Sequence, residues 1–192
     1  PFRSYKSRRP DWAGNDRLPA LACRVSSLPR WVRGFHTWML GRASQWMGVS
    51  GLHANSVAPV LVSREQGRRK SSFCRALMPD VLARYYTDNL KLTSQGEAER
   101  MLAEMGMLIM DEFDKYAESK MPLLKNLMQM SVLNIRKAYQ QNFRQLPRIA
   151  SFIGTSNRFD LLTDPTGSRR FLCIEAKHDL DRTGLEQDRT FA

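Results

Sequence analysis

The sequence predicts an α/β fold in which a parallel β-sheet carries helices on both faces, with a helical extension at its N-terminal side. Two observations favour this class. From residue 57 onward, short apolar runs alternate with stretches of helical spacing, as in strands joined by crossover helices. These runs are apolar almost throughout, which is the pattern of strands whose two faces are both buried.

The composition is that of one globular domain. No apolar run approaches the roughly 18 residues of a membrane span, so we expect a soluble, cytoplasmic protein without membrane contact. Residues 1–50 contain nine Lys and Arg against two Asp, which accounts for +7 of the net charge of +11. Such a basic segment fits either a nucleic-acid partner or a solvated face, and charge alone does not decide between them.

The chain divides into an extended basic arm (1–20), an N-terminal helical segment (21–56), an α/β core (57–178) and an irregular tail (179–192). The arm combines prolines with basic and small residues and has no period. Residues 29–48 place Trp31, Phe35 and Trp38 at helical spacing, which predicts a helix that packs on the core. The tail is acidic and shows no core-forming period.

Within the core we expect strands at 57–63, 107–110, 132–139, 148–157 and 171–176, and a weaker strand at 83–92. Helices are expected at 71–78, 94–105 and 122–131. Ser94 and Glu97 predict a capping box, and Gly106 stands just past the end of that helix. Pro122 fits the first turn of the next helix.

Polar residues follow three of the predicted strands. The sets are Gly67, Arg68, Arg69, Lys70, Ser71 and Ser72 after the first, Asp111, Glu112 and Asp114 after the second, and Thr155, Ser156 and Asn157 after the third. In an open parallel sheet, ligands bind at the carboxyl ends of the strands. We therefore expect these residues to share one site.

The stretch REQGRRKS resembles a phosphate-binding loop, in which Lys70 reaches the terminal phosphates and the Ser71 hydroxyl binds magnesium. Arg64 and Arg69, however, stand where that motif has glycine. A non-glycine residue costs about 1 to 2 kcal/mol where the backbone is left-handed. Binding of a micromolar nucleotide contributes about 8 kcal/mol, so such costs weaken the site without abolishing it. The loop alone fits both a phosphate cradle and a basic loop that only looks like one.

The acids after the second strand favour the cradle. Asp111 can hold magnesium through water, and Glu112 can orient an attacking water. Asn157 suits a sensor of the water or the γ-phosphate, although an ordinary turn asparagine is the alternative. The combined order points to a nucleoside triphosphatase with ATP and Mg²⁺ as cofactors. Arg169 and Arg170, on a Gly/Pro-flanked turn, suit either charge neutralisation of a transferred phosphoryl group or a solvated surface.

Together, LVSREQGRRKSSFCRALMPD, GMLIMDEFDK and RIASFIGTSNRFDLLTDPTGSRRFLCIE resemble the virulence-associated protein E family of bacteria and mobile elements, which is related to AAA+ and superfamily-three primase-helicases. The resemblance covers about residues 21 to 180. It implies a P-loop ATPase core, with Lys70 and Ser71 as the Walker A pair, Asp111 and Glu112 as the Walker B pair, and Asn157 as the first sensor. It also implies that Arg169 or Arg170 acts on a neighbouring copy in a ring.

The same resemblance implies work on single-stranded or duplex DNA, alongside a primase module that these residues do not contain. Between the acidic strand and the sensor strand, a hairpin is expected in which basic residues surround Tyr139 and Phe143. We expect Arg136, Lys137, Arg144 and Arg148 to contact DNA, with a solvated hairpin as the alternative.

Two other functions stay open. One is a degenerate module that grips nucleic acid and hydrolyses nothing. The other is a metabolite kinase, which would need an acceptor pocket and a lid, and the sequence indicates neither.

Overall fold

The structure, a computed structural model, describes residues 15–48, 55–90, 92, 94–113, 116, 118–136, 142–159 and 169–180. In chain order the elements are α2 (Leu18–Cys23), α3 (Pro29–Met47), β1 (Ala58–Val62), α4 (Lys70–Ala76), η1 (Asp80–Tyr85), β2 (Tyr86–Thr87), α5 (Gln95–Glu104), β3 (Met107–Met110), η3 (Glu118–Lys120), α6 (Met121–Leu127), β4 (Val132–Arg136), β5 (Phe143–Pro147), β6 (Ser151–Ser156) and β7 (Phe171–Glu175).

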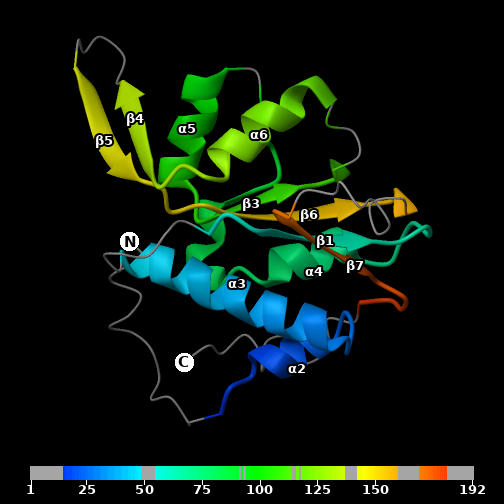
Figure 1. Cartoon of the computed structure of the whole chain (residues 1–192). Helices are drawn as coiled ribbons and strands as arrows, with labels where there is room; N and C mark the ends of the chain where they lie inside the picture. The colour runs from blue at the N-terminus through cyan, green and yellow to red at the C-terminus, as the bar shows by residue number, and fades with distance from the viewer. Residues whose placement is uncertain are drawn as a thin grey trace.

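Five strands form one parallel sheet in the order β2-β3-β6-β1-β7. Helices cover both of its faces, with α2, α3 and α4 on one side and α5 and α6 on the other (Figure 1). The predicted α/β class is therefore confirmed. The strand expected at 132–139 does not join this sheet, because β4 pairs antiparallel with β5 in a separate hairpin.

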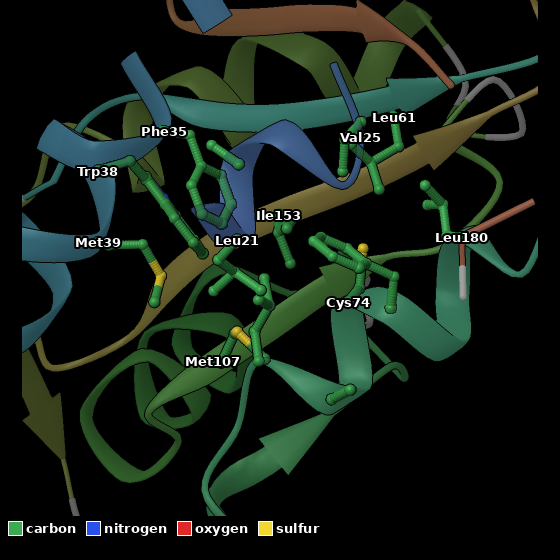
Figure 2. Close-up of a cluster of buried hydrophobic side chains, with 14 of the residues drawn as sticks. Leu21, Val25, Phe35, Trp38, Met39, Leu61, Cys74, Met107, Ile153 and Leu180 are labelled. Carbon is green, nitrogen blue, oxygen red and sulfur yellow. The ribbon is translucent and has the colours of Figure 1, made fainter. Parts of the chain in front are cut away.

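The central strands are buried on both faces, and successive residues serve two different cores. On β3, Met107 and Ile109 belong to the cluster under α2, α3 and α4, whereas Leu108 and Met110 belong to the cluster under α5 and α6. Figure 2 shows the first cluster, in which Met107 is drawn together with Leu21 of α2 and with Phe35 and Trp38 of α3. An uninterrupted apolar run is what such a strand requires, because neither face reaches water.

The N-terminal helical extension is confirmed. Trp31, Phe35 and Trp38 are almost fully buried on α3, as its spacing predicts. A Cβ on Gly34 would lie 2.5 Å from Leu172 of β7, so glycine allows the helix to approach the sheet closely. The prediction of an extended arm is wrong at its end, since α2 begins at Leu18. Residues 1–14 lie outside the described part of the chain.

Arg42 lies inside the core, where its guanidinium stacks on the rings of Trp38 and Trp46, 5.4 and 4.7 Å from their centroids. It donates to the Leu77 carbonyl at 3.2 Å and to the Met107 sulfur at 3.2 Å. Burial lowers the pKa of Arg42 to about 9, which still leaves it charged at neutral pH. This cation joins the N-terminal helix to the end of α4 and the start of β3.

Local signals identify most helix ends. The Ser94 hydroxyl accepts a bond from the Glu97 amide at 3.3 Å, and Pro122 lies in the first turn of α6. Gly106 does not act as a left-handed cap, because α5 ends at an extended Met105. The weak strand at 83–92 is confirmed only as the two-residue edge strand β2, since η1 occupies most of the segment before it.

The predicted boundary between core and tail is wrong by at least two residues. Leu180 is 1% exposed and packs in the cluster under α3 and α4, where Figure 2 labels it. Its amide donates to the Arg68 carbonyl at 3.3 Å, so the chain leaving β7 lies against the loop before α4. Residues 181–192 lie outside the described part. Among the described helices, none is long and apolar enough to cross a membrane.

Candidate functional site

The order of the strands brings three predicted groups to one edge of the sheet. Strand β6 lies between β1 and β3, and the three run in parallel, so their carboxyl ends are adjacent. Val62 pairs with Ser156, and Met110 pairs with Gly154. The loop after β1, the acids after β3 and the asparagine after β6 therefore start from the same edge.

Lys70 opens α4 and turns its ammonium group toward the ends of β1 and β6. It is 9% exposed, and its Nζ donates to the Ser63 hydroxyl at 2.6 Å and to Asn157 Oδ1 at 2.9 Å. The Ser63 hydroxyl donates in turn to the Glu65 carbonyl at 2.7 Å. The predicted meeting of Lys70 with Asn157 is thus present in the structure.

The acidic part of the site adjoins the lysine, and the predicted Asp114 lies outside the described residues. Asp111 Oδ1 accepts bonds from the Ser71 hydroxyl at 2.7 Å and from the Thr155 hydroxyl at 2.5 Å. The Glu112 amide donates to the same Thr155 oxygen at 3.2 Å. Glu112 has a φ of 49°, a left-handed conformation that costs about 1 to 2 kcal/mol for a residue with a Cβ. Surrounding contacts must therefore hold this turn in place.

The oxygen groups present fit a magnesium ion. Magnesium prefers hard oxygen ligands and usually takes one or two from the protein, the rest being water and substrate phosphate oxygens. The Ser71 hydroxyl and the Asp111 carboxylate supply such a pair. Within the described residues, no group of three His, Cys, Asp or Glu side chains forms a metal site from protein ligands alone. Burial raises the pKa of the nearby Cys74 thiol, which therefore stays neutral and is no nucleophile.

The two arginines at glycine positions of the loop have different conformations. Arg69 has a φ of 56°, the left-handed conformation that glycine would adopt without strain, and Gly67 has a φ of 81°. Arg64 has no positive φ and places its guanidinium 4.5 Å from the centroid of the Phe159 ring. Arg68 pairs with Glu65 and, at 3.2 Å, with Asp179. Only Arg69 carries the predicted backbone cost.

A cavity of about 680 Å³ opens beside Ser71 and Asp111. Its walls come from α4, η1, β2 and β3, and Ser72 and Arg75 contribute from α4. The Arg75 guanidinium pairs with Asp88 at 3.1 Å. The lining carries more negative than positive side chains, namely Asp80, Asp88 and Asp111 against Arg75.

Arg169 and Arg170 lie at the opposite end of the strands, where β1 and β7 begin. Arg170 immediately precedes Phe171, which pairs with Ala58 at the start of β1, whereas the site follows the end of β1. At about 3.3 Å per residue, the length of β1 separates these arginines from the site by roughly 15 Å. These arginines therefore do not reach the site of their own chain.

The hairpin of β4 and β5 also lies away from the site, near the amino ends of β3 and β6 (Figure 1). Arg136 and Arg144 are exposed on it, and Phe143, opposite Arg136, is 65% exposed. Arg148 differs, being 2% exposed with its guanidinium donating to the Asn55 carbonyl at 2.8 Å. The prediction that Arg148 contacts DNA is therefore not supported. Lys137 lies outside the described residues.

A sequence profile of the family described as virulence-associated protein E-like domain matches residues 8–191. The chain belongs to this family. The resemblance carried by the loop, the acidic strand and the GTSN segment is thereby confirmed. No curated protein sequence matches the chain.

Two solved structures share the fold of this virulence-associated E-like domain. Both are apo structures, in the A form, of the C-terminal region of NrS-1. One, of residues 305–718, has a TM-score of 0.57 and 16% identity, over 95% of this chain and 43% of the other. The second has a TM-score of 0.60 and 18% identity, over 95% and 44% respectively. The domain thus spans less than half of those chains, and at this identity the likeness establishes the fold alone.

The structure adds Ser63 to the site of this virulence-associated E-like domain and gives Thr155, which the sequence placed in the site without a role, its contacts. Ser63 holds Lys70, and Thr155 holds both Asp111 and the Glu112 amide. Both are buried, at 3% and 2% exposure. Their sequence signal is a hydroxyl in an otherwise apolar run, since a buried hydroxyl needs a hydrogen-bond partner.

Proposed function

We propose that this domain is a P-loop, AAA+-like ATPase core that uses Mg²⁺ and serves a helicase-like protein acting on DNA during replication of a mobile element. The observation that carries the proposal is the arrangement at one sheet edge. There, Lys70 lies 2.9 Å from Asn157, and Ser71 lies 2.7 Å from Asp111. This arrangement suits a nucleoside triphosphate, because it places a cation and an amide beside two oxygen groups that can bind magnesium.

Each group has a role that its contacts support. Lys70 would exchange its bonds to Ser63 and Asn157 for oxygens of the terminal phosphates, with loop amides around Gly67, Arg68 and Arg69 contributing donors. Ser71 and Asp111 would hold Mg²⁺, which neutralises charge on the phosphates when bound. Glu112 would orient the attacking water, and Asn157 would sense the γ-phosphate.

The position of Arg169 and Arg170 favours action between copies of the chain. Because they lie roughly 15 Å from the site of their own chain, any role in phosphoryl transfer requires a neighbouring copy. A homo-oligomeric ring, in which one copy presents this turn to the site of the next, satisfies that requirement. An arginine in such a role contributes about 10³ to 10⁵ in rate.

The hairpin supplies the DNA contact in this proposal. Arg136, Arg144 and Phe143 are exposed on it, and an exposed aromatic ring beside cations suits a single strand, whose bases stack and whose phosphates pair with arginine. A primase module elsewhere in the protein or in a partner would complete the replication function.

Binding of mant-ATP with Mg²⁺ and release of phosphate test the proposal in the whole chain. We expect the parent to bind and hydrolyse ATP, with stimulation by single-stranded DNA, and Lys70→Ala to lose binding. Lys120→Ala, an exposed lysine on η3, is the matched control and should behave as the parent. Equal weak binding by the parent and Lys70→Ala would instead favour the module that grips nucleic acid without hydrolysis.

One observation favours a second candidate. The cavity of about 680 Å³ beside Ser71 and Asp111 is large enough for a small phosphoryl acceptor, the element that a metabolite kinase requires. Labelled γ-phosphate distinguishes the two, since a hydrolase releases free phosphate whereas a kinase transfers the label to an added acceptor.

A further inference from the structure

Thr155 joins the two halves of the acidic turn. Its hydroxyl has one hydrogen, donated to Asp111 Oδ1 at 2.5 Å, and its oxygen accepts the Glu112 amide at 3.2 Å. One buried hydroxyl therefore holds the side chain of the first acid and the backbone of the second.

The backbone that Thr155 holds is strained. Glu112 adopts a φ of 49°, which L-residues avoid because the Cβ approaches the carbonyl oxygen. A strained residue persists only where surrounding contacts determine it. The direction of the Glu112 carboxylate depends on this turn, so the Thr155 bond helps to set where that carboxylate lies.

Strand β6 also connects the acidic turn to the lysine. Thr155 lies in the last two residues of β6, which ends at Ser156, and Asn157 follows directly after the strand. Asn157 contacts Lys70, and Thr155 contacts Asp111. The same strand end therefore sets the separation between the ammonium group and the acids.

We propose that Thr155 is a positioning residue of the phosphoryl-transfer site, acting through Asp111 and Glu112 without touching the nucleotide. This inference rests on the proposed ATPase function. Removing the hydrogen-bond partner of a metal-binding carboxylate typically lowers metal affinity or activity 10- to 100-fold.

The test uses Thr155→Val, which keeps the shape of the side chain and removes both hydrogen bonds. We expect turnover of Mg-ATP to fall about 10- to 100-fold, while the Kd for mant-ATP stays within about threefold because Lys70 is untouched. Thr155→Ser keeps the hydroxyl and should restore turnover to within about threefold of the parent. Ser151→Ala removes a buried hydroxyl at the other end of β6 and should leave turnover unchanged.

A double substitution tests the route through Glu112. In a Glu112→Gln background, Thr155→Val should cause a smaller loss in single-turnover hydrolysis than it causes in the parent, because one of the two groups that Thr155 positions is already inactive. Losses that multiply would overturn this route. If Thr155→Val unfolds below the assay temperature, Thr155→Cys against Thr155→Ser gives the same comparison at matched size.

The remaining outcomes are decisive in separate ways. Turnover within about threefold of the parent in Thr155→Val, or an equal loss in Ser151→Ala, overturns the role of Thr155 and leaves the ATPase function intact. Absence of ATP turnover in the parent overturns the proposed function, and the assignment of Thr155 with it.

Discussion

Two arginines occupy glycine positions of the phosphate loop, and the structure predicts opposite results when each is restored to glycine. Arg69 has a φ of 56°, so Arg69→Gly relieves a strain of about 1 to 2 kcal/mol. Glycine costs about 0.5 to 1 kcal/mol in backbone entropy on folding. The Arg69 side chain is exposed, so little packing is lost. We expect a net stabilisation of about 0.5 to 1 kcal/mol.

Arg64→Gly should destabilise. Arg64 has no positive φ, so glycine relieves nothing, and the contact over the Phe159 ring is lost. A cation–π contact at an exposed site contributes about 0.5 to 1 kcal/mol. Adding the entropy cost of glycine gives a loss of about 1 to 2 kcal/mol.

Thermal unfolding followed by circular dichroism measures both changes. For a chain of this size, 1 kcal/mol shifts Tm by about 2 to 4 °C, which is resolvable. Arg69→Ala separates the side chain from the backbone, because alanine keeps the strain, and it should leave the free energy of unfolding nearly unchanged. If Arg69→Gly destabilises as much as Arg64→Gly, the left-handed strain at Arg69 does not exist.

Three further predictions concern the buried and exposed arginines. Arg42→Met should raise the free energy of unfolding by about 1 kcal/mol or more at pH 7, since it removes a buried cation that has no counter-ion among the described residues. Arg42→Ala should lower the free energy of unfolding by leaving a cavity, and thermal unfolding measures both changes. Burial lowers the pKa of Arg42 to about 9 in the folded state. Below pH 9 the folded protein therefore carries the free-energy cost of a buried charge, and this cost is relieved as the pH rises above 9. The advantage of Arg42→Met in unfolding experiments should therefore shrink above pH 9, and a constant difference would contradict that cause. On single-stranded DNA, Arg136→Ala and Arg144→Ala should each reduce the slope of log affinity against log salt by about 0.7, while Arg148→Ala, which is buried, should leave the slope unchanged.

Much of the fold follows from local patterns. The apolar run before Asp111 is a strand, the aromatic spacing of α3 is a buried helix face, and Ser94 caps α5, all as predicted. These features depend on periodicity and on neighbouring residues, which the sequence displays directly. The convergence of Lys70 and Asn157 was also predictable, because parallel strands place their carboxyl ends together.

Other features depend on contacts between distant segments. Arg144 and Arg148 stand four residues apart in one basic stretch, yet the first is exposed and the second is buried. The difference arises because Arg148 meets the carbonyl of Asn55, 93 positions away. Leu180, an isolated apolar residue in an acidic tail, is buried because the exit from β7 passes beside the phosphate loop.

The candidate site shows the same division. Residue type and position along the chain were enough to identify an ammonium group, two acids and an amide as its chemical groups. Which hydroxyls hold them depended on strand order, since Thr155 faces Asp111 only because β6 lies between β1 and β3. Periodicity specifies whether a side chain is buried, but the partner it meets there is determined by the pairing of strands far apart in the chain.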